Sequence, residues 1–115
     1  MISKWANYVI TAVRYETTYR NGEGKRIAAV EARMDLGGRL GRAEIWTRQQ
    51  IQEAISHDHE TFATALPGKS GRWRRGDHVR QIRINGLDYL RTDRVAIPGD
   101  DLGELAELWD RGAAG

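Results

Sequence analysis

The chain has 115 residues, of which 40% are hydrophobic and 30% are charged, and its formal net charge is +2. This length fits one domain over residues 1–115, and the composition is that of an ordinary soluble protein with a modest core. Because the sequence contains no cysteine, disulfides and thiolate metal sites are excluded. Its start carries no apolar signal core and no apolar run is long enough for a membrane span, so we expect a cytoplasmic protein that does not enter membranes.

The first two elements are predicted to form an antiparallel hairpin. Residues 8–15 are dense in β-branched and aromatic side chains, which is typical of a strand. Residues 26–34 alternate between apolar and polar positions, with Arg33 on the polar face, and this period of two predicts a half-buried strand. Between these strands, Asn21 and Gly22 favour a turn because both reach positive φ at low cost.

The clearest local signal is a helix start. A glycine-rich connection over residues 35–42 and a short extended segment precede it. Thr47 and Gln50 have the spacing of a capping box, which satisfies two backbone N–H groups at a helix N-terminus. The apolar spacing that follows predicts a helix over residues 48–56.

The second half of the chain is predicted to hold three strands and a short helix. Residues 61–66 read as a strand, and residues 69–76 form a basic loop. Two further strands flank Asn85 and Gly86, which is the strongest hairpin signature that a sequence carries. Apolar residues recur at helical spacing from Leu102 to Trp109, so we expect a C-terminal helix, capped by Asp100 and Asp101.

These elements define an α+β fold. We expect a mainly antiparallel sheet of about five strands, with one central helix packed on one face and a short C-terminal helix. The apolar positions of the predicted strands and helix supply the core candidates, which are Trp46, Ile51, Ile55, Phe62, Ile82 and Ile84.

Several segments together resemble a known family. They are WTRQQIQEAI (46–55), FAT (62–64), VRQIRINGLDYLRTD (79–93), the opening YVITAVRY (8–15) and the closing DDLGEL (100–105), where Asp101 replaces the family's Asn. In this order they resemble the domain-of-unknown-function family 3892, which comprises small bacterial and phage domains. The resemblance covers most of the chain and implies a compact one-domain protein, with no established activity and no functional residues.

The most suggestive site lies in the basic loop. Arginine side chains surround one indole there, and another arginine follows on the next predicted strand; these residues are Arg72, Trp73, Arg74, Arg75 and Arg80. Guanidinium groups pair with phosphates, and an indole offers a stacking face for a base. The alternative is a solvated loop whose Trp73 covers one edge of the core.

Charge is unevenly distributed along the second half of the chain. Residues 66–94 hold eight basic and three acidic residues, and residues 95–115 hold one basic and five acidic residues. The acidic segment either folds back on the basic one or leaves it free.

Other constellations carry weaker signals. Residues 37–42 are rich in glycine but lack the Lys-Ser/Thr of a P-loop, which favours a plain turn. The histidines and acids of residues 57–60 lack an evident third metal ligand. Asp77 and His78 are adjacent and would face opposite sides of a strand. No hydroxyl lies in a nucleophile-elbow context. We therefore predict no metal, no cofactor and no catalytic residue, and an enzyme with an unfamiliar site ranks last among the hypotheses.

The sequence therefore favours a small non-enzymatic binding module for a phosphate-bearing partner, either a nucleic acid or a nucleotide. The alternative is a protein-interaction or self-associating module. Four tryptophans are many for this length, and Trp5 and Trp109 lie near the chain ends, where a small core does not readily reach them.

Overall fold

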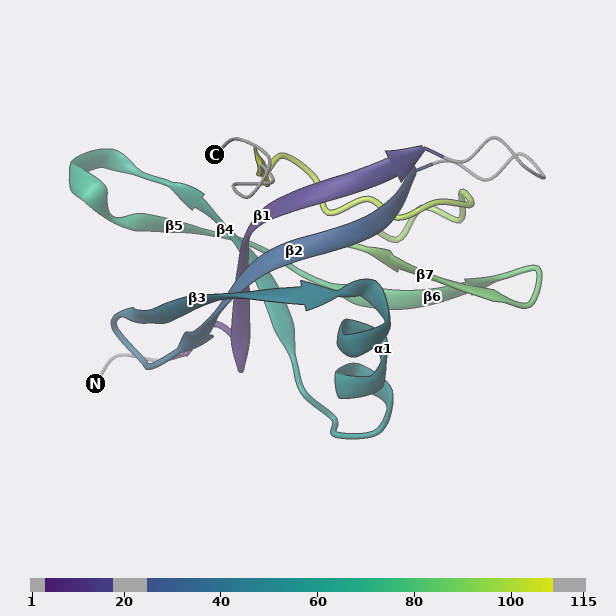
Figure 1. Ribbon diagram of the computed structural model, residues 1–115, viewed down its shortest axis with the longest axis horizontal. Coiled ribbons are helices and arrows are strands. Elements are labelled where there is room, and N and C mark those ends of the chain that lie inside the picture. Colours follow the sequence, from purple (N-terminus) through teal and green to yellow (C-terminus); the bar gives the residue numbers. More distant parts are fainter. Residues whose placement is uncertain (1–3, 18–24, 109–115) are drawn as a thin grey trace.

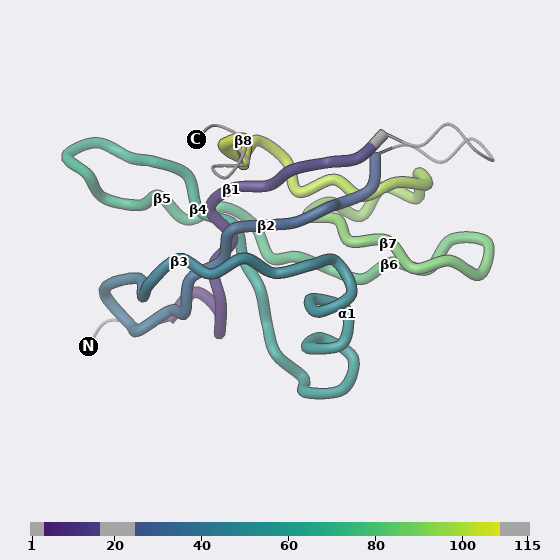
Figure 2. The backbone as a smooth tube through the Cα atoms, in the orientation of Figure 1, coloured from purple at the N-terminus to yellow at the C-terminus, as the bar shows by residue number. Residues whose placement is uncertain are grey.

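The computed structural model describes residues 4–17 and 25–108, whose path is shown in Figures 1 and 2. The elements in chain order are β1 (Tyr8–Thr17), β2 (Lys25–Asp35), β3 (Leu40–Thr47), α1 (Arg48–Ser56), β4 (Phe62–Pro67), the 3₁₀ turn η2 (Lys69–Gly71), β5 (Trp73–His78), β6 (Arg80–Ile84), β7 (Leu87–Arg91) and β8 (Ala106–Glu107). Within this part of the chain, no helix has the length and apolarity that a membrane span requires.

Strand β1 organises the main sheet, whose order is β3-β2-β1-β4-β5, with β8 also paired to β1. One edge of β1 runs antiparallel to β2. On the other edge, residues 8–10 lie parallel to β4, and residues 12 and 13 lie parallel to β8. Residues 9–13 of β1 are all buried, so both faces of the strand are covered there, which explains the unbroken apolar and β-branched run.

Three local predictions are confirmed. The β1–β2 hairpin is antiparallel, although the predicted turn at Asn21 and Gly22 lies outside the described residues. The β6–β7 hairpin turns at Asn85 (φ 51°) and Gly86 (φ 81°), the left-handed pair that a type I′ turn requires. Helix α1 begins after Thr47, whose hydroxyl accepts from the Gln50 N–H at 3.2 Å while the Gln50 side chain accepts from the Thr47 N–H at 2.8 Å.

The predicted sheet is wrong in its pairing. The main sheet is mixed rather than mainly antiparallel, because α1 carries the chain from β3 back to the start of β4, which then enters parallel to β1. The prediction of a central helix is also wrong, since α1 directly follows β3 and lies at one side of the molecule (Figure 1). Two predicted connections are shorter than expected, because β3 already begins at Leu40 and the second half of the basic loop, residues 73–76, belongs to strand β5.

The predicted C-terminal helix is wrong. Gly103 has a φ of 76°, which a right-handed helix does not allow, so the apolar spacing there does not wind into a helix. Leu102 instead enters the core, 1% exposed, and its N–H donates to the Tyr15 hydroxyl at 2.9 Å. The segment then extends as β8 along the part of β1 that β4 has left, and so satisfies that edge of the strand.

The main apolar core lies where α1, the central strands and the C-terminal segment meet. Its cluster of buried residues comprises Ile10, Val13, Ile27, Val30, Ala32, Ile51, Ala54, Phe62, Leu90 and Leu102. Of the six predicted core residues, Ile51 and Phe62 are fully buried, and Trp46 and Ile55 pack against the cluster from partly buried positions. Ile82 and Ile84 are only half-buried, because β6 belongs to the separate two-stranded sheet.

A buried carboxylate ties the C-terminal segment to this core. Asp100 is 1% exposed and accepts from the Ile27 N–H at 2.8 Å and the Leu90 N–H at 2.9 Å. It also accepts from Arg48 Nε at 2.7 Å and Nη2 at 3.1 Å. The prediction that Asp100 caps a helix is therefore wrong. Its carboxylate instead joins β2, β7 and α1. We call Arg48, Arg91 and Asp100 together the C-terminal seam.

Candidate ligand-binding groove

A groove of about 660 Å³ opens between the β2–β3 turn and the β4–β5 hairpin. Figure 1 shows both hairpins projecting from the same side of the molecule. The lining residues are Trp5, Arg33, Asp35, Gly38, Arg39, Leu40, Gly71, Arg72 and Trp73, and we call this site the arginine–tryptophan groove. Its volume falls in the range of small-molecule sites.

A buried aspartate builds one wall of the groove. Asp35 is 3% exposed, and its carboxylate accepts from the backbone N–H groups of Trp5 at 2.6 Å, Ala6 at 3.4 Å and Gly37 at 2.9 Å. Hydrogen bonds from backbone amides compensate a buried carboxylate without a cation. Asp35 therefore holds the segment that carries Trp5 against the β2–β3 turn and leaves the nearby arginines without a carboxylate partner.

The β2–β3 turn depends on its glycines. Gly37 (φ 73°) and Gly38 (φ 120°) both occupy backbone regions that side chains disfavour, and the Leu36 N–H donates to the Arg39 carbonyl at 3.0 Å. The glycine-rich segment is thus a tight turn, as the sequence favoured, followed by the start of β3. The turn brings Arg39 to the groove and leaves the wall at Gly38 bare of side-chain atoms.

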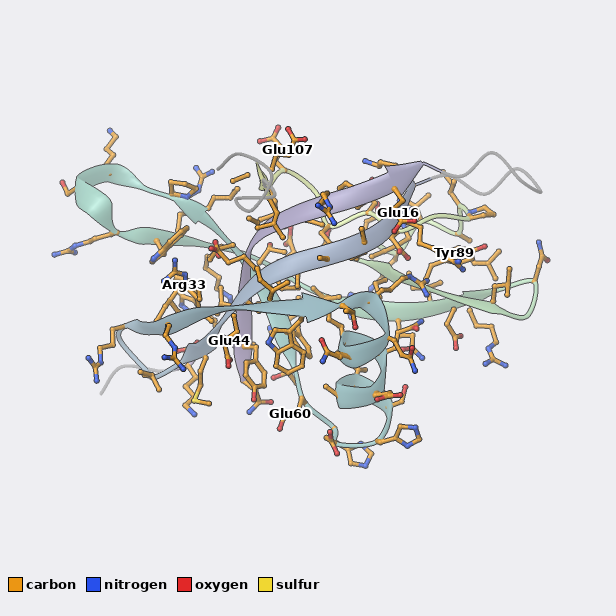
Figure 3. All side chains as sticks on the ribbon, in the orientation of Figure 1. Glu16, Arg33, Glu44, Glu60, Tyr89 and Glu107 are labelled. Carbon is orange, nitrogen blue, oxygen red and sulfur yellow. The ribbon has the colours of Figure 1, made fainter. Side chains whose placement is uncertain are left out.

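Arg33 connects the two hairpins across the groove. Its guanidinium carbon lies 5.7 Å from the centre of the Trp73 ring, which is within cation–π range. Its Nη1 donates to the Gly41 carbonyl at 3.3 Å, while its buried Nε has no hydrogen-bond partner. Figure 3 shows the labelled Arg33 between the β2–β3 and β4–β5 hairpins. One donor of this side chain is therefore without a hydrogen-bond partner.

The arginines that line the groove form no ion pair with a carboxylate in the described part of the chain. Arg39 and Arg72 are exposed. Among residues 4–17 and 25–108, the ion pairs are Arg48–Asp100, Arg83–Asp88, Arg91–Asp93 and Arg91–Asp101, and none involves a groove arginine. With Arg33, the groove thus presents three guanidinium groups without an ionic partner, beside the half-buried indoles of Trp5 and Trp73.

The structure divides the five predicted binding residues into three groups. Arg72 and Trp73 line the groove. Arg74 and Arg75 follow on β5 and are exposed, outside the lining, and Arg75 Nη2 lies 3.1 Å from His78 Nε2. Arg80 is exposed on β6, in the second sheet.

The acidic segment does not fold over these arginines in the described part of the chain. Asp100 and Asp101 contact Arg48 and Arg91 instead. Trp73 is half-buried rather than enclosed. Both findings leave the positive surface open to a ligand.

Sequence reasoning missed most of the groove. Arg33 was expected on the polar face of its strand, but nothing local indicated that Trp73, forty residues later, would stack on it. Arg39 lies in the predicted turn and Trp5 near the chain start, and neither has a local partner that marks a site. The one available signal was the sequence of Asp35 followed by two glycines and Arg39, which is typical of a tight turn that presents a basic side chain.

The other candidate constellations contribute no assembled site. Within the described ranges, no three His, Asp or Glu side chains are placed to hold a metal ion. The Asp77 backbone pairs with the Thr64 hydroxyl, and the His78 ring contacts Arg75 rather than Asp77.

Comparison of the chain with family models, with curated proteins and with solved structures finds no match. The resemblance to the domain-of-unknown-function family 3892 therefore stays a prediction.

Proposed function

We propose that this protein is a non-enzymatic binding module whose arginine–tryptophan groove takes a phosphate-bearing ligand with an aromatic base, a nucleotide or a single-stranded nucleic acid. One observation carries the proposal: three guanidinium groups without carboxylate partners and two half-buried indoles line a single groove. Phosphate and base are the two chemical groups that this combination recognises best.

The arginines supply the phosphate contacts. A guanidinium donates two parallel hydrogen bonds to a phosphate, and both Arg39 and Arg72 are exposed and free to do so. Arg74 and Arg75 extend the positive surface along β5 and raise the local concentration of anions. Arg80 lies on another sheet and contributes only through the overall field.

The indoles supply the base contact. The Arg33 guanidinium lies over the Trp73 ring, 5.7 Å from its centre, and this contact favours the present orientation of the ring. Stacking of one base on an aromatic side chain contributes about 1–3 kcal/mol and tolerates any base. We therefore expect little sequence preference.

The test is fluorescence anisotropy of a labelled single-stranded oligonucleotide over a series of salt concentrations. We expect binding that weakens steeply with salt, and a double variant, R39A/R72A, with lower affinity and a slope of log K against log[salt] reduced by about 1.4, because each phosphate contact contributes about 0.7.

The matched control is R80A/R94A, which removes the same charge from exposed positions outside the groove lining. This control should keep the wild-type slope. Equal losses in both double variants would mean that the overall charge, and not the groove, attracts the oligonucleotide. Binding that ignores ionic strength would also count against the proposal.

Self-association is the alternative function. Its support is an exposed apolar patch at the β2–β3 turn, where Met34 is 46% and Leu36 is 44% exposed. Size-exclusion chromatography with light scattering should then show a dimer or larger species. A strict monomer at high concentration would exclude this alternative.

A further inference from the structure

A second groove, of about 380 Å³, lies beside β3 and α1. Its lining residues are Tyr8, Glu44, Ile45, Trp46, Gln50, Glu53, Ala54, Asp58 and Glu60, and we call it the acidic groove. It shares no residue with the arginine–tryptophan groove, so what it binds is independent of the function proposed above.

Negative charge in the acidic groove is unneutralised. In the described ranges Glu44, Asp58 and Glu60 have no ion pair and no side-chain hydrogen bond, and Glu53 accepts only from Gln49 Nε2, at 3.2 Å. Figure 3 shows Glu44 and Glu60 on the same side of the molecule, away from Glu107. No three acidic or histidine side chains among the described residues converge to hold a metal, so the charge is spread along the groove.

The inner wall of the acidic groove is aromatic. The rings of Tyr8 and Trp46 lie 4.8 Å apart, and Phe62 closes the wall behind them at 5.4 Å from each. Ring faces beside carboxylates suit the aliphatic stem and cationic head of a lysine or arginine side chain. The groove is therefore complementary to basic side chains in both charge and shape.

The adjoining edge of the sheet is open. Strand β3 is the first in the sheet order, and no described strand pairs with its outer edge. Ile45 in this edge strand is 60% exposed. An unpaired edge presents alternate N–H and C=O groups that can accept another strand.

We propose that an extended basic segment of a partner protein adds as a strand to the outer edge of β3 and places its lysine or arginine side chains in the acidic groove. In a strand, alternate side chains point to the same face about 6.6–6.8 Å apart. With that spacing, successive basic side chains can each face a different carboxylate of the groove. The carboxylates lie too far apart to bind one metal ion together. The backbone edge favours a polypeptide over a small polyamine, because only a polypeptide can complete the strand pairing.

The experiment is isothermal titration calorimetry with a synthetic peptide that alternates lysine and valine. We expect E44Q/E60Q to weaken peptide binding about tenfold, because each exposed ion pair contributes a factor of a few. The matched control E107Q, a carboxylate on β8 outside the groove, should bind as the wild type does. Circular dichroism spectra of the variants check that the fold is unchanged.

Two further probes separate the strand from the charge. The same peptide methylated at every backbone nitrogen should lose most of its affinity, since neither of its edges can then donate hydrogen bonds to β3. Spermidine should bind more weakly than the unmodified peptide. The proposal is overturned by unchanged peptide binding to E44Q/E60Q, by full binding of the methylated peptide, or by equal affinity for spermidine. It is also overturned if the free protein is a dimer that E44Q/E60Q dissociates, because the occupant of the groove would then be a second copy of this chain.

Discussion

The arginines of the C-terminal seam and those of the arginine–tryptophan groove have the same chemistry and opposite roles. In the seam, the Arg48 side chain is 15% exposed and contacts Asp100 at 2.7 Å, while Arg91 is 7% exposed and contacts Asp93 at 2.6 Å. In the groove, Arg39 and Arg72 are exposed and have no ionic partner in the described part of the chain.

The difference shows what burial requires of a charge. A guanidinium that leaves water is stabilised by a carboxylate and by hydrogen bonds, and most donors of the seam arginines are engaged in this way. Arg91, for example, also donates to the carbonyls of Ile97 and Gly99. A guanidinium at the rim of a groove keeps its donors for a phosphate. Each role predicts a different response to substitution.

The largest expected effect is the loss of the buried carboxylate. D100A leaves Arg48 and the N–H groups of Ile27 and Leu90 without their acceptor. Removing one partner of a buried ion pair costs about 3–5 kcal/mol of unfolding free energy, which urea denaturation measures. D100N, which keeps one acceptor oxygen, should lose less.

The neighbouring residue provides the control. The side chain of Asp101 is 38% exposed and lies 3.8 Å from Arg91, so D101N should cost no more than about 1 kcal/mol. Equal losses in D100A and D101N would contradict the central role of Asp100.

The β4–β5 hairpin, which carries Trp73, depends on a close approach between Gly76 and Thr64. A substitution at this contact should lower the unfolding free energy less than D100A does. A Cβ atom at Gly76 would lie 2.1 Å from Thr64 Oγ1 and 3.0 Å from the Thr64 carbonyl oxygen. G76A should therefore cost about 1–3 kcal/mol in urea denaturation. Because the closest atom is the hydroxyl oxygen, T64A/G76A should be more stable than the sum of its single variants predicts. Additive losses would mean that the backbone contact dominates.

Alkaline pH should destabilise the fold through Tyr15, whose hydroxyl accepts from the Leu102 N–H. Burial raises the pKa of the Tyr15 hydroxyl above its usual 10.0, and the charges of Asp101 and Asp100 raise it further, against the opposing effects of the Leu102 N–H and Arg91. Because the folded pKa is the higher one, this stabilisation is complete below the unfolded pKa and is lost as pH rises through the folded pKa. Unfolding measured on both sides of pH 10 should show a steeper decline in the wild type than in Y15F. Identical declines would contradict the assignment.

The smallest expected effect is on the groove side of the comparison. R39A/R72A should change the unfolding free energy by no more than about 0.5 kcal/mol per site, because exposed side chains without partners contribute little. Thermal denaturation of R39A/R72A beside R48A measures the contrast. A loss in R39A/R72A as large as that in R48A would show that the groove arginines are structural.

The sequence predicts the local elements well and their assembly poorly. The capping box of Thr47 and Gln50 and the turn at Asn85 and Gly86 are encoded by residues within a few positions of each other, and both are confirmed. The prediction of a C-terminal helix was wrong because tertiary packing and strand pairing outweighed the helical spacing of the apolar residues. Gly103 takes a positive φ, Leu102 packs into the core, and β8 completes the edge of β1.

The groove illustrates the same limit for function. The notable composition around Trp73 pointed to the β4–β5 hairpin, and two of the five named residues line the groove. Arg33 could not be predicted as a site residue from the sequence. Its contact with Trp73 joins β2 to β5, and β1 and β4 lie between these two strands in the sheet order. Likewise, counting basic residues could not separate Arg91, which is buried in the seam, from Arg72, which is exposed.

The most direct test of the groove is an NMR titration of the ¹⁵N-labelled protein with a short single-stranded oligonucleotide, which follows the indole N–H signals. The account predicts that the signals of Trp5 and Trp73 shift together with Arg33 Nε–H, while the signal of Trp46, which lines the acidic groove, stays in place. Shifts at Trp46 alone, or no shift at any indole, would contradict it.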